Sequence, residues 1–204
     1  MLPSHAEITR HHDEPPGVDP WVEGYVDRPY AIRVEEYDDA WPAAFERVAS
    51  AVRDALGARM LEIHHVGSTS VPGLPAKPII DVDLVVSDPA DEAAYLPALV
   101  GAGFRHAIRE PWWHEHRLLK YDDPHTNLHV FGPDCPEVIR HAMFRQWLLD
   151  HPDELATYAE AKRTAAAEIN GREGGGTGMD YNRVKEPVVR AIYGRMFRAH
   201  GMLA

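Results

Sequence analysis

Two aspartates interrupt the most apolar run of the chain. Residues 79–86 read Ile-Ile-Asp-Val-Asp-Leu-Val-Val, a length and a β-branched content that predict a buried strand. Side chains two residues apart in a strand project from one face, so Asp81 and Asp83 lie together, with Cα atoms roughly 6.5 Å apart. Two carboxylates on one buried face are unfavourable unless a partner neutralises them. The partner we expect is Mg²⁺ (or Mn²⁺) that also binds substrate phosphate; a row of aspartates facing solvent is the alternative.

A polar loop separates this strand from an earlier one predicted at residues 61–66. The loop begins with Gly67-Ser68, thirteen residues before the first aspartate when counted from the serine. Glycine lets the backbone approach a phosphate closely, and exposed N–H groups and the serine hydroxyl donate hydrogen bonds to its oxygens. We therefore expect a phosphate-binding turn at Gly67 and Ser68, with Thr69 and Ser70 as helpers.

The rest of the chain predicts strands first and helices last. This order favours one α+β domain over residues 30–204, with a mixed sheet flanked by helices and a helical C-terminal third. Residues 1–29 show neither apolar period and predict an extended or partly disordered N-terminal arm. Pro187 is expected to kink or split the last helix. The expected strands are residues 31–36, 61–66, 79–86, 104–108, 116–121 and 127–131, and the expected helices are residues 40–56, 88–100, 136–149, 152–169 and 181–199.

Composition narrows the classes of partner. The formal net charge is −11, whereas a protein that binds nucleic acid broadly needs a basic face. A small phosphorylated substrate stays compatible with this charge, because a bound metal offsets charge locally. No stretch approaches the roughly 20 apolar residues of a membrane span, and residues 1–20 lack the pattern of a secretory signal. We expect a cytoplasmic protein without a membrane partner, and the single Cys135 excludes an internal disulfide.

The loop and the aspartate strand together form a recognisable pattern. Residues 65–83 read His-Val-Gly-Ser-Thr-Ser-Val-Pro-Gly-Leu-Pro-Ala-Lys-Pro-Ile-Ile-Asp-Val-Asp, and this segment resembles the GrpB-like members of the nucleotidyltransferase superfamily. The resemblance extends over about residues 30–199. It implies the polymerase-beta-like nucleotidyltransferase fold, with Gly67 and Ser68 as the phosphate turn and Asp81 and Asp83 as metal carboxylates. It implies no assigned substrate. Further matching segments are residues 115–118, 127–130 and 144–148, Tyr158 with Lys162, and Tyr181 with Lys185.

One position departs from the wider superfamily, where a third carboxylate usually stands on a neighbouring strand. The corresponding strand here, residues 126–131, offers His129 and no acid. A neutral imidazole ligates metal or acts as a base near neutral pH, so His129 is a candidate for both roles. A partly buried, hydrogen-bonded histidine is the alternative. Zinc bound by His114, His116 and His129 is disfavoured, because their spacing fits no structural zinc pattern.

Several other side chains are candidates for substrate contacts. Arg117, in a predicted strand, suits a bidentate phosphate contact, with a surface salt bridge as the alternative. A tyrosine and a lysine stand four residues apart on two predicted helices, where such pairs share a face and are expected to close over a nucleotide. Solvated helix lysines are the alternative for both pairs. The candidates are Lys77 for phosphate, His65 for substrate, Tyr158 with Lys162, Tyr181 with Lys185, and Trp112-Trp113 for base stacking.

These residues predict a metal-dependent nucleotidyltransferase that acts from a nucleoside triphosphate onto an unidentified small-molecule acceptor. The missing third acid leaves an alternative open, a regulatory module that binds nucleotide without transfer. A triphosphate-dependent activation or condensation at the same metal pair is a further alternative.

Overall fold

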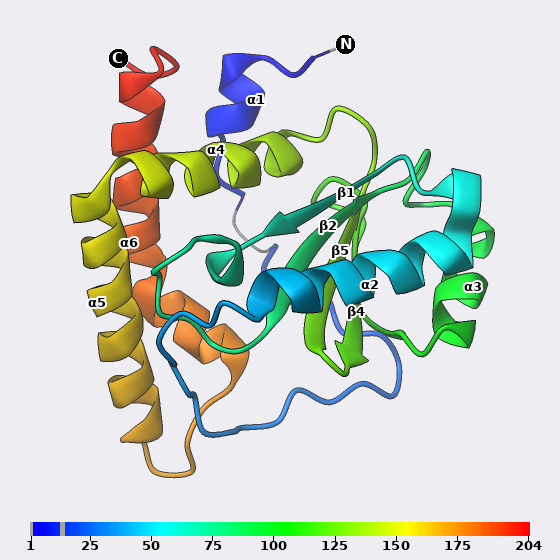
Figure 1. Cartoon of the computed structure of the whole chain (residues 1–204), viewed down its shortest axis with the longest axis horizontal. Coiled ribbons are helices and arrows are strands. Elements are labelled where there is room, and N and C mark those ends of the chain that lie inside the picture. Colours follow the sequence, from blue (N-terminus) through cyan, green and yellow to red (C-terminus); the bar gives the residue numbers. More distant parts are fainter. Residues whose placement is uncertain (1, 13–14) are drawn as a thin grey trace.

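The computed structural model describes residues 2–12 and 15–204 and contains a five-stranded mixed sheet (Figure 1). The strand order is β1-β2-β5-β4-β3. β2 and β5 run parallel, and the three other neighbouring pairs run antiparallel. The expected α+β fold with a mixed sheet is therefore confirmed. The strands are β1 (Glu62–Val66), β2 (Ile80–Val85), β3 (Arg105–Glu110), β4 (His116–Asp122) and β5 (His125–Phe131).

One face of the sheet packs against α2 (Trp41–Leu56) and α3 (Leu96–Gly101). Val48 and Val52 of α2 lie four residues apart on its apolar face and are fully buried in the main core. The same core takes Ile80, Val82 and Leu84, the residues that alternate with the aspartates of β2. Because alternate strand residues point to opposite faces, this packing directs both aspartates to the other side of the sheet.

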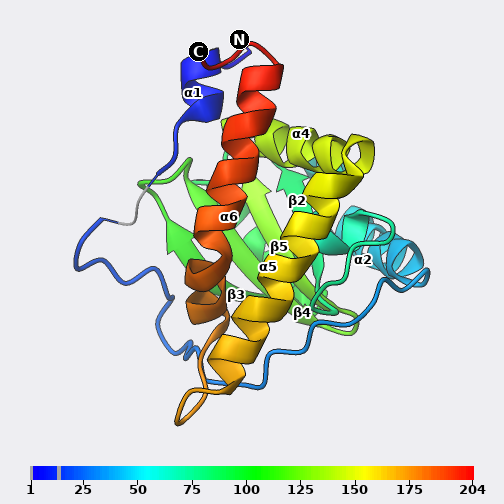
Figure 2. The same ribbon diagram turned by 90° about the vertical axis from the view of Figure 1, so that its left-hand side faces the viewer.

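The helical C-terminal third lies on that other side. It consists of α4 (Pro136–Asp150), α5 (Pro152–Asn170) and α6 (Gly178–Ala199). Figure 2 shows α5 and α6 passing in front of the strands, with α2 to the right of the sheet. α4 and α5 each begin with a proline in their first turn, where the missing N–H removes no helical hydrogen bond. The layer of α5 and α6 leaves room for a cavity above the aspartate face of β2.

Two elements differ from the sequence expectation. The strand expected at residues 31–36 is absent, and a single bridge between Glu35 and Ala76 stands in its place. The helix expected at residues 88–100 is reduced to a 3-10 turn at Glu92–Ala94 and to α3, because Pro97 has no N–H to donate to the carbonyl four residues earlier and therefore lies in the first turn of α3. At Pro187, where a kink or a split was expected, α6 continues through the proline and bends in its first turns, as Figure 1 shows.

The N-terminal arm packs on the domain over much of its described length; residues 1, 13 and 14 lie outside the described part. Its first element, α1 (His5–Thr9), starts with a capping box between Ser4 and Glu7. Ile8 packs against α6, and the guanidinium of Arg140 on α4 donates to the Ile8 carbonyl at 2.9 Å. Further on, the backbone of Val22 bonds to the edge strand β3. No helix of the described residues is long and apolar enough to cross a membrane.

Glu92 holds together two arginines on the face covered by α2 and α3. Its carboxylate accepts hydrogen bonds from Arg109 Nε and Arg117 Nε, both at 2.6 Å. Partial burial alone would raise the pKa of Glu92, but hydrogen bonds and charge from Arg109 and Arg117 outweigh it and lower the pKa to about 2. The carboxyl titrates near 4.5 in the unfolded chain, so the ion pair contributes stability above pH 4.5 that is lost as the pH falls towards 2.

Replacing Glu92 should therefore destabilise the protein in a pH-dependent way. We expect Glu92→Gln to lower the free energy of unfolding by about 2 kcal/mol at pH 7, with a smaller difference from the parent at pH 3. Urea denaturation at both pH values measures this difference. The control is Glu168→Gln, which removes an exposed i,i+4 pair with Arg172 and should change little. Equal losses for Glu92→Gln at both pH values would contradict the assignment.

Candidate functional site

The two aspartates of β2 face the helical layer side by side. In the register of the sheet, Asp81 pairs with Asn127 and Asp83 pairs with His129 of the parallel strand β5. The Asn127 amide donates to Asp81 Oδ1 at 2.7 Å. Asp83 is fully buried, so the alternative of an aspartate row facing solvent is wrong. The carboxylates and their β5 neighbours form a polar patch inside the protein.

Asp83 is held by a histidine that the sequence did not suggest. His141 of α4 places Nδ1 2.8 Å from Asp83 Oδ2, and its Nε2 lies 3.8 Å from Glu137 Oε2. Burial disfavours the charged imidazole, but the charge and hydrogen bond of Asp83 outweigh it and raise the pKa of His141 to about 9. The second oxygen, Asp83 Oδ1, is buried without a hydrogen-bond partner among the described residues. An orphaned buried carboxylate oxygen is a position that a cation or an ordered water satisfies.

The turn after β1 brings its backbone against Asp81. Gly67 has φ +66°, and a Cβ added there would lie 2.3 Å from Asp81 Oδ2, so only glycine fits. Ser68 begins a 3-10 turn, and the Ser70 hydroxyl donates to the Gly67 carbonyl at 2.7 Å inside that turn. Thr69 Oγ1 is buried and lies 3.0 Å from His65 Nε2. Gly67 and Ser68 thus face the aspartates, whereas the hydroxyls of Ser70 and Thr69 stabilise the turn.

Lysines and tyrosines of the helical layer stand opposite the aspartates. Lys162 is 2% exposed, donates to the Pro75 carbonyl at 2.9 Å and lies 4.4 Å from the Tyr158 ring centroid. Lys77 and Lys185 lie 4.8 and 5.5 Å from the centroid of the Tyr181 ring. Burial lowers the pKa of Lys77 to about 8, and that of Lys162 well below its usual value. Cations this close and this poorly hydrated favour a multiply charged anion.

These groups enclose a cavity of about 310 Å³ between the sheet and α5 and α6, which we call the aspartate cavity. Most of the residues proposed from the sequence line it, together with Asn127, His141 and Asn182, which the sequence did not single out. The proposed residues in its wall are Gly67, Ser68, Lys77, Asp81, Trp113, His129, Tyr158, Lys162, Tyr181 and Lys185. Residues from β1 to α6 thus meet at one place.

His129 ends a chain of buried hydrogen bonds. Glu110 Oε2 lies 2.7 Å from His116 Nδ1, and His116 Nε2 lies 3.0 Å from His129 Nδ1. If Glu110 is ionised it accepts from His116 Nδ1, so His116 Nε2 must accept from His129 Nδ1 and the lone pair of His129 resides on Nε2. Burial raises the pKa of Glu110 to about 7, lowers that of His116 to about 3 and lowers that of His129 far below its usual value. Both imidazoles are therefore neutral near pH 7.

Within the described part of the chain, no three or more histidine, cysteine, aspartate or glutamate side chains are arranged so that they could hold a metal ion, which includes the histidines considered for zinc. His116 and His129 bond to each other instead. Trp113 packs edge-on to His116, with ring centroids 4.8 Å apart, and lines the cavity. Trp112 is not part of the cavity wall.

The structure keeps Arg117 and His65 away from this cavity. Arg117 faces α2 and α3 with its neighbour Leu119 and is bound by Glu92, so a phosphate contact from that position is wrong. His65 pairs in register with Val82 and points to the same face, where its ring stacks on Phe45 at 4.8 Å. The reason is strand alternation in both cases, because each residue is one step out of phase with those that face the cavity.

Some site residues were not predicted from the sequence, and they differ in how far the sequence alone could have indicated them. Asn127 stands two residues before His129 in a predicted strand, so alternation alone places both on one face. His141 comes from α4 and Asn182 from α6, and nothing in their local sequence relates them to β2. Glu110 and His116 belong to neighbouring strands, and their contact depends on the β3–β4 register.

Comparison with known proteins gives consistent matches. The sequence model of a family described as GrpB protein matches residues 31–195. A UPF0157 protein of Halalkalibacterium halodurans is 48% identical over 136 residues, covering 67% of this chain and 70% of that protein. A dephospho-CoA kinase of Mycolicibacterium paratuberculosis is 29% identical over 80% of this chain and 46% of that protein. The crystal structure of GrpB from Enterococcus faecalis, 26% identical, superposes with a TM-score of 0.70 over 82% of this chain and 99% of that chain.

The contact between Gly67 and Asp81 can be isolated by a matched pair of variants. Gly73 has φ +79° with open space around its Cβ position, so Gly73→Ala costs only the backbone strain of a side chain at positive φ, about 1 kcal/mol. We expect Gly67→Ala to lose about 2 kcal/mol more, because its methyl group overlaps the Asp81 carboxylate. Thermal and urea unfolding of both variants provide the comparison. Equal destabilisation would mean that the turn does not press on Asp81.

Proposed function

The chain belongs to the GrpB family, and we propose that it transfers a nucleotidyl group from a nucleoside triphosphate to a small-molecule acceptor. The main observation that supports this proposal is the position of the lysines in the structure. The sequence has four lysines, Lys77, Lys120, Lys162 and Lys185, and a net charge of −11. Three of the four line the aspartate cavity, and Lys120 bonds to Asn127 in its wall at 2.6 Å. An acidic protein that collects its lysines around one buried carboxylate patch is built to receive an anion there.

The mutual repulsion of the lysines supports a polyphosphate as that anion. Burial lowers the pKa of Lys77 and Lys162, and the positive charge of Lys185 lowers both pKa values further, so the charged forms of these lysines are disfavoured together. Asp81 supplies a single opposing carboxylate in the cavity wall. A triphosphate brings several negative charges and relieves this repulsion. The Gly67-Ser68 turn, which leaves the backbone close to the cavity, suits the outer phosphates.

Asp81 and Asp83 are the residues that would hold Mg²⁺ or Mn²⁺. The partnerless Asp83 Oδ1 fits a cation, and Mg²⁺ needs only a few carboxylate oxygens because water and phosphate complete its shell. When bound, the metal supplies charge neutralisation at the transferred phosphoryl group. His141 acts through Asp83, since its hydrogen bond to Oδ2 fixes the direction of Oδ1.

His129 is the group proposed to take the acceptor's proton. In the transfer, the hydroxyl oxygen of the acceptor attacks the α-phosphorus, the bond from that phosphorus to the β-phosphate oxygen breaks, and pyrophosphate leaves. The hydroxyl proton passes to the lone pair on His129 Nε2. With Glu110 ionised, the hydrogen bonds from Glu110 through His116 hold the imidazole in this tautomer. The same lone pair would make His129 a metal ligand, which is the other proposed role of this side chain.

A second candidate function follows from the acidic side chains. Among the residues that line the aspartate cavity, Asp81 is the only carboxylate, whereas catalytic transferases of this superfamily usually carry a third acid on a neighbouring strand. This favours, as the alternative, a regulatory module that binds nucleotide without transfer. Activation of a carboxylate by the triphosphate is a further alternative, and it needs no base, since a carboxylate nucleophile has no proton to lose.

Nucleotide binding should depend on a divalent cation and on Lys185. We expect calorimetry with ATP, GTP, CTP and UTP to detect binding with Mg²⁺ and to lose it in chelator. Lys185→Ala should weaken binding about tenfold, because one of three phosphate-facing charges is removed. Arg172→Ala, which removes an exposed cation paired with Glu168, is the matched control and should bind normally. Unchanged affinity in chelator or in Lys185→Ala would argue against the polyphosphate site.

The role of His129 can be separated from a structural one in a single variant. As a base, His129→Asn should lower turnover in a coupled pyrophosphate assay by about 100-fold and leave nucleotide affinity nearly intact. As a metal ligand, it should weaken Mg²⁺ and nucleotide binding together. As a buried structural histidine, it should lower the melting temperature, with activity following the folded fraction. No change in any of the three measurements would remove His129 from the site. If the parent protein binds nucleotide tightly but releases no pyrophosphate, the regulatory module would be favoured.

A further inference from the structure

A second, larger cavity adjoins the aspartate cavity. Its volume is about 830 Å³, within the range of about 300–1,000 Å³ that is usual for small-molecule sites. The two cavities have part of their walls in common, so a molecule in the larger one reaches the groups around Asp81. The residues that line both are Lys77, Ile79, Trp113, Asn127, His129 and Asn182.

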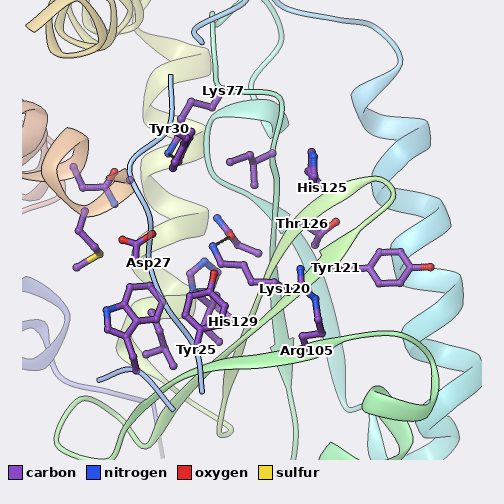
Figure 3. A pocket seen from close by; sticks show the side chains of 18 of the residues that line it. Tyr25, Asp27, Tyr30, Lys77, Arg105, Lys120, Tyr121, His125, Thr126 and His129 are labelled. Atoms are coloured by element: carbon purple, nitrogen blue, oxygen red, sulfur yellow. Dashed lines mark hydrogen bonds between the residues drawn. The ribbon is translucent and has the colours of Figure 1, made fainter. Parts of the chain in front are cut away.

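The larger cavity lies between the open face of the sheet and the N-terminal arm. Ile108 of β3 and Leu118 of β4 form an apolar floor against which Trp21 and Tyr25 of the arm pack. The rings of Trp21 and Tyr25 are stacked, with centroids 4.7 Å apart and planes 8° apart. Figure 3 shows Tyr25 and Asp27 of the arm, and Tyr30 directly after it, across the cavity from the strands that carry Lys120 and His129. The arm is therefore one wall of the cavity.

Backbone hydrogen bonds fix this wall in place. Val22 N donates to the Ala107 carbonyl at 3.0 Å, and Arg109 N donates to the Pro20 carbonyl at 2.9 Å, so the arm extends the edge of the sheet. Glu35 exchanges two backbone hydrogen bonds with Ala76, which anchors the other end of the wall. A wall tied at both ends gives a preformed cavity, which reduces the entropy lost when a ligand binds.

The charged groups on the strand side of this cavity already have partners. Arg105 pairs with Asp122 at 2.6 Å, Lys120 donates to Asn127 at 2.6 Å, and Glu110 bonds to His116. The facing wall carries the aromatic rings of Trp21, Tyr25 and Tyr30, and its charged residues balance in number, with Asp27 and Glu35 against Arg28 and Arg33. This contrasts with the aspartate cavity, where three lysines face one carboxylate. The larger cavity thus favours an uncharged ligand with an apolar body.

We propose that the larger cavity binds the acceptor, as a small uncharged molecule with an aromatic or branched apolar body and one hydroxyl or amine group. The assignment of this ligand as acceptor rests on the function proposed above. The apolar body lies between Tyr25 and the floor formed by Ile108 and Leu118. The hydroxyl or amine group extends to the shared wall, where His129 and Asn127 are reached from both cavities.

The test uses three matched probes without nucleotide: 3-phenylpropan-1-ol, its carboxylate counterpart 3-phenylpropanoate, and the polyol sorbitol. We expect saturable binding of phenylpropanol by ligand-observed NMR, and at least tenfold weaker binding of the other two. Tyr25→Ser should weaken phenylpropanol binding by about fivefold, because it removes half of the stacked pair. Tyr37→Ser, a tyrosine that packs on Trp41 of α2 outside both cavities, is the matched control and should bind like the parent.

A second variant keeps the test valid if Tyr25→Ser loses binding because it misfolds. Val26 lines the cavity and is 65% exposed, so Val26→Asp adds a charge without removing core packing and should also weaken phenylpropanol binding. Stronger binding of phenylpropanoate or sorbitol, or phenylpropanol binding unchanged in both Tyr25→Ser and Val26→Asp, would overturn the proposal. Triphosphate calorimetry is independent of these probes. Phenylpropanol binding without triphosphate binding would support an apolar site and reject nucleotidyl transfer, whereas the reverse result would reject only the acceptor class.

Discussion

The packing of the apolar face of β2 against α2 determines the rest of the site. Ile80, Val82 and Leu84 are buried in the main core, and burying an aliphatic side chain of this size contributes about 1.5–3 kcal/mol. A slip of one residue in this strand would place Asp81 and Asp83 in the core and three aliphatic side chains in a polar cavity. Hydrophobic burial therefore holds two carboxylates in a position that their own electrostatics oppose.

Neighbouring side chains offset part of the repulsion between the two carboxylates. His141 neutralises one oxygen of Asp83, and Asn127 donates to Asp81, yet Asp83 Oδ1 keeps no partner among the described residues. On the opposite wall, the lysines stack on tyrosine rings, whose faces attract cations without cancelling their charge. Opposite charges are thus kept apart across the cavity instead of collapsing into ion pairs. Such an arrangement is higher in energy without a ligand and gains more from binding one.

Much of the strand framework was predictable from sequence, because alternation and glycine-rich loops are local signals. The five strands of the sheet were expected within two residues of their observed bounds, and Gly67, Ser68 and Asp81 of the motif line one cavity, with Asp83 buried in the same strand. The faces of Arg117 and His65 were not predictable from type alone, since they depend on which strand residue packs inward. His141 was out of reach because its approach to Asp83 depends on how α4 crosses the sheet.

The packing of the N-terminal arm could not be predicted from the sequence, for a different reason. Residues 1–29 lack apolar periodicity, and periodicity is the only signal by which sequence analysis detects packing of this kind. The arm is attached in part through main-chain atoms, as in the hydrogen bond from Val22 N to the Ala107 carbonyl, and main-chain bonding leaves no residue pattern. Its side-chain contacts come from isolated residues, Ile8 against α6 and Trp21 and Tyr25 against the sheet.

The larger cavity therefore has two walls of different origin. The sheet wall lies within residues 31–195, the part that the chain has in common with its family, whereas Trp21 and Tyr25 lie before that part. Main-chain attachment tolerates many side chains, so substitutions at these two positions reshape the cavity without disturbing β2 or its carboxylates. Under the proposed function, relatives would differ in the molecules they accept through changes in a short N-terminal stretch, without changes around Asp81.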